Sequence, residues 1–523
     1  QDQQKRCCAH PCRSVDARAR GSGDPAVLAM GNTQQAATPG LCCCKHDGGG
    51  SGKEITGKDR QHQLVVQKVA DMRPGFVQED VAVLARKARV GAHLILNMDI
   101  NKTVMMTDAA TGKTTEVVVN EVLASTSWGK AKVDGGWSLQ VPTPSVSRPA
   151  AAPGDAPYVS YTEWVSTTSP GPAHKKKRAK LQGEFTKPDN PGDKLRDVAD
   201  RMVSNLMLPD GSEMKLIPAF FELLLRLKRE NRSFTVCFRT FGEDLSSVAR
   251  ELTQFCEGKH PVYPGVCMDG TDGDVDYRLI PGCKERYGTF HRDADSGMSL
   301  VMGTVDQPGE GEFKDAKDRS MNFYNSYTDV EVKRGYDSVK EYLGQRCAIP
   351  GSLGLRDHYP FWFKNGMTSA AGKVFFFDPS NTSGQHALFF DDNLGLEELY
   401  IVQPVSVRDP HRRFWPTYLF QTHLCKAEPL ESIADPEYFV KHVQRMEEGC
   451  ERRLKARARL KRLVTSAKWV GRLGKELGQD PNEAWGRGLR EDVEPYDPWL
   501  VLRRRKSSIT TTFCPAESEA RTY

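Results

Sequence analysis

The chain has no apolar run that approaches the ~20 residues needed to cross a bilayer. Its most apolar stretch, 219–227, is short and carries charged residues, which predicts a buried helix. The two cysteine clusters, in 7–12 and 42–46, lack the paired Cys-x2-Cys spacing of a zinc site. The histidines, His386 among them, also show no metal-ligand spacing. A membrane-spanning protein and a zinc finger are therefore disfavoured, while lipidation or metal binding stays an alternative to incidental cysteines in the clusters.

The chain also lacks a large excess of either positive or negative charge. The 73 basic and 68 acidic residues leave a net charge of +5, too balanced to imply nucleic-acid binding by itself. Hydrophobic residues make up only 38% of the 523, so we expect part of the chain to stay outside any packed core. The length suits about two to four domains.

Composition and periodicity divide the chain into eight segments. In order, we expect a disordered N-terminal segment (1–60), the first part of a core (61–139), a Pro-rich linker or insertion (140–190), the second part of the core (191–256), a Gly- and Asp-rich insertion (257–335), the third part of the core (336–425), a basic helical extension (426–504) and a disordered tail (505–523).

Apolar runs typical of buried strands alternate with helical spacing. The predicted strands cover 92–98, 233–238, 373–377, 386–390 and 400–405. The predicted helices cover 115–128, 194–205, 218–229, 243–255, 436–449 and 451–475. This alternation favours an α/β fold built on a parallel sheet.

Three of the predicted strands end abruptly in polar residues. The first runs into Asp99-x-Asn101-x-Thr103, the second into Arg239-Thr240-Phe241-Gly242, and the strand at 386–390 into Asp391-Asp392-Asn393. A lysine precedes the last of them, either Lys373 or Lys364. In parallel α/β sheets, chemistry gathers just beyond the carboxyl ends of strands, where a carboxylate can act as a nucleophile or hold a metal.

In this order, the four features resemble motifs I to IV of the haloacid dehalogenase (HAD) superfamily. The resemblance implies a Rossmann-type parallel sheet with helices on both faces. It also implies two cap-type insertions, which the segments 140–190 and 257–335 would supply.

The resemblance assigns roles to the residues that match. Asp99 would be the nucleophile that forms an aspartyl-phosphate, and Thr240 and Lys373 would stabilise charge on the phosphoryl group. Mg²⁺ would bind Asp99, the backbone carbonyl of Asn101, and Asp391 or Asp392. The residues expected to contact substrate are Thr103, Arg239, Thr240 and Gly242.

Asn101 departs from the pattern, since HAD phosphatases carry a general acid–base carboxylate there. An amide cannot exchange a proton at neutral pH, and loss of such help typically removes about 10²–10⁴ in rate. The protein would then be a slow phosphatase for good leaving groups, accumulate its phosphoenzyme, or bind without catalysis. If the missing acid limits turnover, Asn101→Asp raises hydrolysis at least about tenfold; no change means that another acid serves or that the site is inactive.

The sequence thus favours a Mg²⁺-dependent phosphohydrolase or phosphotransferase with low turnover, acting on a small phosphorylated substrate. The rival interpretation is an inactive HAD-fold binding module that contacts nucleic acid or an anionic surface through the basic helix 451–475. We expect an intracellular, cytoplasmic protein; the run 174–180 is typical of either a nuclear-import signal or a solvated loop. Oligomeric state and substrate identity stay open, and so does a targeting segment ahead of Gln1.

Overall fold

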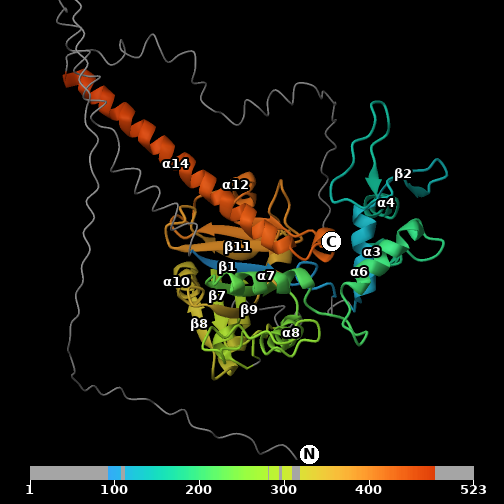
Figure 1. The fold of residues 1–523 in the computed structure, drawn as a ribbon, viewed down its shortest axis with the longest axis horizontal. Helices are drawn as coiled ribbons and strands as arrows, with labels where there is room; N and C mark the ends of the chain where they lie inside the picture. Colours follow the sequence, from blue (N-terminus) through green and yellow to red (C-terminus); the bar gives the residue numbers. More distant parts are fainter. Residues whose placement is uncertain (1–91, 108–111, 281, 294–296, 309–318, 477–523) are drawn as a thin grey trace, which may run out of the picture. The chain divides into compact units, whose positions relative to one another are not determined.

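The computed structural model describes residues 92–107, 112–280, 282–293, 297–308 and 319–476 (Figure 1). The two segments predicted to be disordered, 1–60 and 505–523, lie outside the described residues, as do residues 61–91 of the first predicted part of the core and 477–504 of the predicted basic extension.

The strands are β1 (His93–Asp99), β2 (Trp128–Ala131), β3 (Trp137–Leu139), β4 (Val159–Ser160), β5 (Phe234–Thr240), β6 (Tyr287–Asp293), β7 (Gly297–Met302), β8 (Glu331–Arg334), β9 (Gly351–Arg356), β10 (Lys373–Phe377), β11 (Gln385–Asp391), β12 (Val402–Ser406) and β13 (Leu424–Lys426). The helices are α3 (Thr115–Thr126), α4 (Tyr161–Thr168), α5 (Lys175–Gly183), α6 (Arg196–Ser204), α7 (Pro218–Arg229), α8 (Leu245–Cys256), α9 (Arg319–Asn322), α10 (Tyr336–Arg346), α11 (Tyr359–Lys364), α12 (Pro416–Phe420), α13 (Pro429–Ala434) and α14 (Tyr438–Glu476).

The main sheet has eight strands in the order β13-β11-β1-β5-β9-β6-β7-β8. All pairs from β13 to β6 are parallel, whereas β7 and β8 continue the sheet antiparallel. The predicted α/β class with a mostly parallel sheet is therefore confirmed. One predicted strand, 373–377, became β10, which pairs in parallel with β12 in a separate two-stranded sheet.

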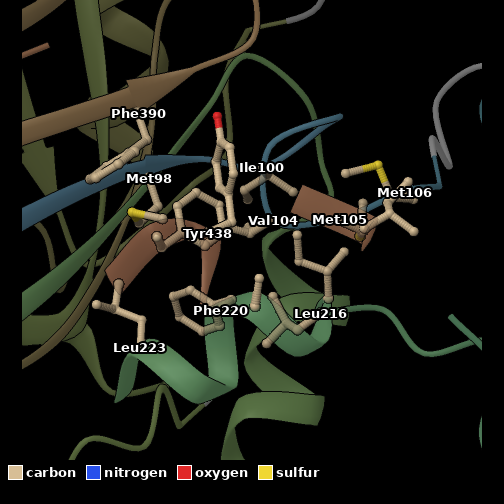
Figure 2. Packing of buried hydrophobic residues seen from close by; sticks show 14 of the residues in the cluster. Met98, Ile100, Val104, Met105, Met106, Leu216, Phe220, Leu223, Phe390 and Tyr438 are labelled. Atoms are coloured by element: carbon tan, nitrogen blue, oxygen red, sulfur yellow. The ribbon is translucent and has the colours of Figure 1, made fainter. Parts of the chain in front are cut away.

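Apolar side chains cover both faces of the central strands, as burial on both sides requires of a parallel sheet. Figure 2 shows one face, where Met98 of β1 and Phe390 of β11 lie against Phe220 and Leu223 of α7 and Tyr438 of α14. All five side chains are buried, and burying a large apolar side chain contributes about 1.5–3 kcal/mol. On the other face, α10 and the β10–β12 pair pack against the sheet.

Both predicted insertions contain regular structure. The segment between β1 and β5 includes α3 to α7 and a small antiparallel sheet in the order β3-β2-β4. The prolines of 140–190 predict a linker or an insertion with its elements interrupted, yet α4 and α5 form inside it, and a capping box between Ser160 and Glu163 begins α4. In the second insertion, 257–335, the strands β6 to β8 extend the main sheet instead of forming a sheet of their own.

The two C-terminal helices predicted at 436–449 and 451–475 are one helix, α14. Its first half packs on α7, and further along Leu460, Leu463 and Val464 are exposed among basic residues. Among the described residues, no helix combines the length and apolar character needed to cross a bilayer.

Candidate active site

Three neighbouring strands of the sheet end in the polar residues that the sequence singles out. Asp391 closes β11, Asp99 closes β1 and Thr240 closes β5, and these strands lie side by side and parallel. Parallel strands place their carboxyl ends at one edge of the sheet, which is where α/β proteins bind ligands. The three motifs thus meet at one edge of the sheet, although Asp99 and Thr240 are 141 positions apart in the sequence.

Lys373 places its ammonium group between two of these carboxylates. Its Nζ donates to Asp391 Oδ2 at 2.8 Å and also to Asp99 Oδ1, and the side chain is 1% exposed. Burial lowers the pKa of Lys373, but Asp391 and Asp99 together raise it above the ordinary value, so the ammonium keeps its charge. Lys364, the alternative lysine, is exposed at the end of α11. The geometry therefore selects Lys373.

The preceding glycine makes this placement feasible. A Cβ on Gly372 would overlap the backbone carbonyl of Ile401, because β10 begins in close contact with that segment. Lys373 N donates to the same carbonyl at 2.6 Å. The Gly372-Lys373 pair thus anchors the first residue of β10 where its side chain reaches the carboxylates.

Three carboxylates gather around this lysine. Oxygens of Asp99, Asp391 and Asp392 lie within 4.8 Å of one another. Burial raises the pKa of Asp99 to about 7, and burial together with the charge of Asp391 holds the pKa of Asp392 well above its usual range. Lys373 supplies one positive charge against three carboxylates. A hard divalent cation with oxygen ligands would offset the remaining repulsion. We call these four residues the carboxylate centre.

The turn after β1 positions the centre. Lys102 adopts a left-handed backbone conformation (φ 59°), and its N–H donates to Met105 O at 2.8 Å. This tight turn buries Thr103, whose Oγ1 accepts from Asp392 N at 3.2 Å and lies 3.5 Å from Asp99 Oδ2. Thr103, predicted to bind substrate, uses its hydroxyl to tie two carboxylate-bearing loops together.

Asn101, the residue that departs from the HAD pattern, contacts an acid from another element. Its Nδ2 donates to Asp244 Oδ2 at 3.0 Å, while its Oδ1 is buried without a hydrogen-bond partner. Asp244 immediately precedes α8 and is 2% exposed. A carboxylate therefore lies within hydrogen-bond distance of the side chain that occupies the expected acid position.

Thr240 and Gly242 form the adjoining loop. Thr240 Oγ1 accepts from Gly242 N at 2.8 Å, which leaves its O–H able to donate elsewhere. A Cβ on Gly242 would lie 2.8 Å from Asp244 Oδ2 and 3.5 Å from Thr240 Oγ1, so only glycine leaves this approach open. Gly242 also lines a cleft of about 500 Å³ whose wall includes Arg356 and Lys284.

Arg239 lies away from this cleft. It is 2% exposed and pairs with Asp357 through two hydrogen bonds of 3.0 and 2.6 Å. Its Nη1 donates to Val374 O at 2.9 Å and to Asn97 Oδ1 at 3.4 Å, and its guanidinium lies 5.0 Å from the centre of the Phe290 ring. Because successive strand residues point to opposite faces, the contacts of Arg239 are internal while Thr240 faces the site. We interpret Arg239 as a buried residue whose hydrogen bonds hold neighbouring segments together, and not as a substrate contact.

Two features of the site had no clear signal in the sequence. Asp244 follows Thr240 by four residues, but an acid just before a helix is ordinarily a capping residue. Arg356 ends β9, a strand whose sequence Gly-Ser-Leu-Gly-Leu-Arg shows no continuous apolar run. Only the parallel pairing of β9 with β5 brings Arg356 beside Thr240.

Comparison with known proteins gives no assignment, because no family model, no curated protein and no solved structure matches this chain. Function is therefore inferred from the residues and their geometry.

Proposed function

We propose that this protein is a Mg²⁺-dependent phosphohydrolase of the HAD type that acts through an aspartyl-phosphate on Asp99. The observation that carries the proposal is the convergence of Asp99, Lys373 and Asp391 at one sheet edge, with ion pairs from the lysine to both carboxylates. These residues come from three separate strands and match, in order, the motifs that the sequence predicts. Asp392 and Thr240 complete the set.

The donor set fits a magnesium ion. Asp99, Asp391 and Asp392 offer only oxygen ligands, which suits a hard cation, and their crowding leaves an excess of negative charge. The backbone carbonyl of Asn101 would complete the ligands, and it does not depend on the side chain at that position. When bound, the ion supplies Lewis-acid stabilisation of the phosphoryl oxygens and offsets their repulsion from the nucleophile.

The protein's own residues account for the remaining steps. An Asp99 carboxylate oxygen attacks phosphorus, and the leaving-group oxygen takes the electron pair of the broken P–O bond. The ammonium of Lys373 lowers the pKa of Asp99 against the effect of burial, which favours the ionised nucleophile, and it neutralises charge that develops on the phosphoryl group. The Thr240 hydroxyl donates to a phosphoryl oxygen. Such fixed donors supply most of the stabilisation that a loose phosphoryl transition state requires.

Asp244 supplies the acid that motif I lacks. Its carboxyl group lies 3.0 Å from the Asn101 amide and beside the position that a Gly242 Cβ would fill. There it protonates the leaving-group oxygen and later accepts a proton from the water that hydrolyses the aspartyl-phosphate. The cleft lined by Gly242 and Arg356 has room for the leaving group of a small phosphate ester.

The test is hydrolysis of a panel of alkyl, aryl and acyl phosphates by the full chain, with Mg²⁺ and with EDTA. We expect Mg²⁺-dependent phosphate release and a hydroxylamine-sensitive phosphoenzyme. Asp99→Asn should lower turnover by about four orders of magnitude or more, as loss of a nucleophile does. Asp409→Asn, at an exposed carboxylate after β12, is the matched control and should leave turnover unchanged.

Two results would contradict the proposal. One is the absence of phosphate release from every compound by folded protein, which would favour the non-catalytic interpretation and direct attention to the basic part of α14. The other is release that persists in Asp99→Asn, which would place the nucleophile elsewhere.

A further inference from the structure

A second cluster of metal-ligating side chains lies at the amino end of β11, away from the carboxylate centre. It consists of His386 in β11, His423 immediately before β13 and Cys450 in α14, and we call it the amino-end cluster. One ligand atom from each lies within 4.8 Å of the others, and all three side chains are buried. The described residues contain only one other such group, the three carboxylates.

The contacts of the cluster resemble those around a metal. His386 Nε2 lies 3.3 Å from Cys450 Sγ, close to the ~3.5 Å that separates imidazole and thiolate ligands around tetrahedral zinc. The carbonyl oxygen of Thr422 accepts a hydrogen bond from the same Nε2 at 2.7 Å and one from Sγ at 3.6 Å, so an oxygen that could serve as a fourth ligand lies beside both groups. Two imidazoles, one thiol and an oxygen thus converge on one point.

His423 is held in the orientation that a ligand needs. Its Nδ1 lies 2.9 Å from Ala387 O, so a proton on Nδ1 leaves the Nε2 lone pair free for coordination. Backbone carbonyls commonly fix metal-binding histidines in this way.

The third ligand arrives through close packing of α14. A Cβ on Gly449 would overlap the carbonyl oxygen of Gln421, so the helix lies directly against the segment that carries His423. Cys450, the next residue, thereby enters the cluster with 7% of its surface exposed. A metal here would bind three elements together: β11, the segment before β13, and α14.

We propose that His386, His423 and Cys450 form a structural zinc site, with the Thr422 carbonyl as the fourth ligand. Zn²⁺ prefers this mixture of imidazole and thiolate at tetrahedral geometry, unlike the oxygen-only carboxylate centre. Binding converts the Cys450 thiol to a thiolate and releases one proton, and the proton that His386 Nε2 donates to the Thr422 carbonyl moves to Nδ1 so that Nε2 can bind the ion. Because the ligands are buried, the ion enters as the chain folds.

The chain contains a matched control. Cys425 Sγ lies 3.3 Å from His442 Nδ1, the same pair of groups at the same distance, on β13 and α14. No third ligand joins this pair among the described residues. Cys425→Ser therefore removes a buried thiol beside a histidine without touching the proposed site.

The experiment uses the full chain produced in zinc-depleted medium supplemented with Co²⁺, which replaces Zn²⁺ and reports thiolate ligation through its near-ultraviolet charge-transfer band. We expect wild type and Cys425→Ser to show this band and to hold one more equivalent of cobalt than Cys450→Ser and His423→Gln. Cys450→His should retain the cobalt and lose the band, because imidazole replaces the thiolate. Protein from zinc-containing medium should show the same one-equivalent difference in zinc content.

Cobalt content equal in wild type, Cys450→Ser and His423→Gln would overturn the proposal, and so would a band that survives in Cys450→Ser. Because His423→Gln lies on a different element from Cys450, misfolding of one variant leaves the other as a test. The thiolate band is insensitive to metal bound by Asp99, Asp391 and Asp392, so failure here is distinguishable from failure of the phosphohydrolase proposal.

Discussion

The two ends of β11 carry opposite kinds of chemistry. At the carboxyl end, Asp391 joins a group of carboxylates and one lysine beside a cleft. At the amino end, His386 joins a second imidazole and a thiol in an enclosed, apolar setting. His386 and Asp391 are five positions apart, roughly 16 Å along an extended strand.

The difference follows from the surroundings of the two strand ends, because loops border a cleft at the carboxyl ends whereas a helix packs at the amino end of β11. Loops beyond the carboxyl ends, such as the one with Gly242, border a cleft of about 500 Å³, as is usual where parallel α/β sheets bind ligands. At the amino end of β11, Cys450 of α14 instead lies 3.3 Å from His386, and both side chains are buried, so a metal there would be bound by protein ligands without water. Under the two proposals, one strand would contribute to a catalytic site at one end and to a structural metal site at the other.

Of the predictions that follow, the largest effect concerns Asp244, the acid proposed to replace the one that motif I lacks. Asp244→Asn should lower hydrolysis of alkyl phosphates, which have poor leaving groups, by about 10²–10⁴ and change aryl and acyl phosphates much less. Asn101→Asp should give no gain in wild type but should restore activity in the Asp244→Asn background, because it returns a carboxyl group to the same place. Steady-state kcat/KM across the leaving-group series measures this. Equal losses for all leaving groups would rule out proton transfer by Asp244.

The next effect concerns the lysine between the carboxylates. Lys373→Met leaves Asp99 and Asp391 buried without their counter-charge, which should cost about 3–5 kcal/mol of unfolding free energy in EDTA. Urea denaturation measures the loss. Lys364→Met, at an exposed lysine, should stay within about 0.5 kcal/mol of wild type. Similar stabilities for the two variants would mean that Lys373 does not hold the centre together.

Metal removal should distinguish the two sites at the ends of β11, because each is expected to depend on a different metal. At a free Zn²⁺ concentration of about 100 times the dissociation constant, binding would add about 2.7 kcal/mol to the free energy of unfolding. A strong chelator applied during refolding should therefore lower the melting temperature of wild type but not of Cys450→Ser. Adding Mg²⁺ should then restore hydrolysis without restoring the melting temperature. Recovery of both by Mg²⁺ alone would show that the ends are not independent.

The smallest expected effect concerns the control pair. Burial lowers the pKa of His442 to about 4, below the ordinary 6.5 of the unfolded chain. Between these values only the unfolded state takes up the proton, so stability is full above about pH 6.5 and falls as pH decreases toward 4. For this partly exposed ring the change is roughly 1–2 kcal/mol. His442→Gln should flatten that part of the stability–pH profile, and an unchanged slope would assign the effect to other groups.

The sequence predicts elements well where one local signal dominates. The strands β1, β5 and β11 are apolar runs that end in polar residues, and α7 begins at Pro218, as the pattern indicates. Prediction from the sequence fails where tertiary packing overrides the local pattern of residues. β9 was not predicted because Gly351–Arg356 contains two glycines, yet it pairs along its whole length with β5. Gly449 predicts a break, but α14 continues through it because Gln421 packs there.

The sequence by itself determined which residues end the strands, and therefore that Asp99, Thr240 and Asp391 lie at one edge of a parallel sheet. This follows from hydrophobic patterning, a property of neighbouring residues. The tertiary structure alone decided that Lys373 and not Lys364 reaches the carboxylates, and that Asp244 contacts Asn101. It alone also decided that His386 meets His423 and Cys450. Contacts between residues far apart in the chain depend on how elements pack, and residue spacing in the sequence carries no record of that packing.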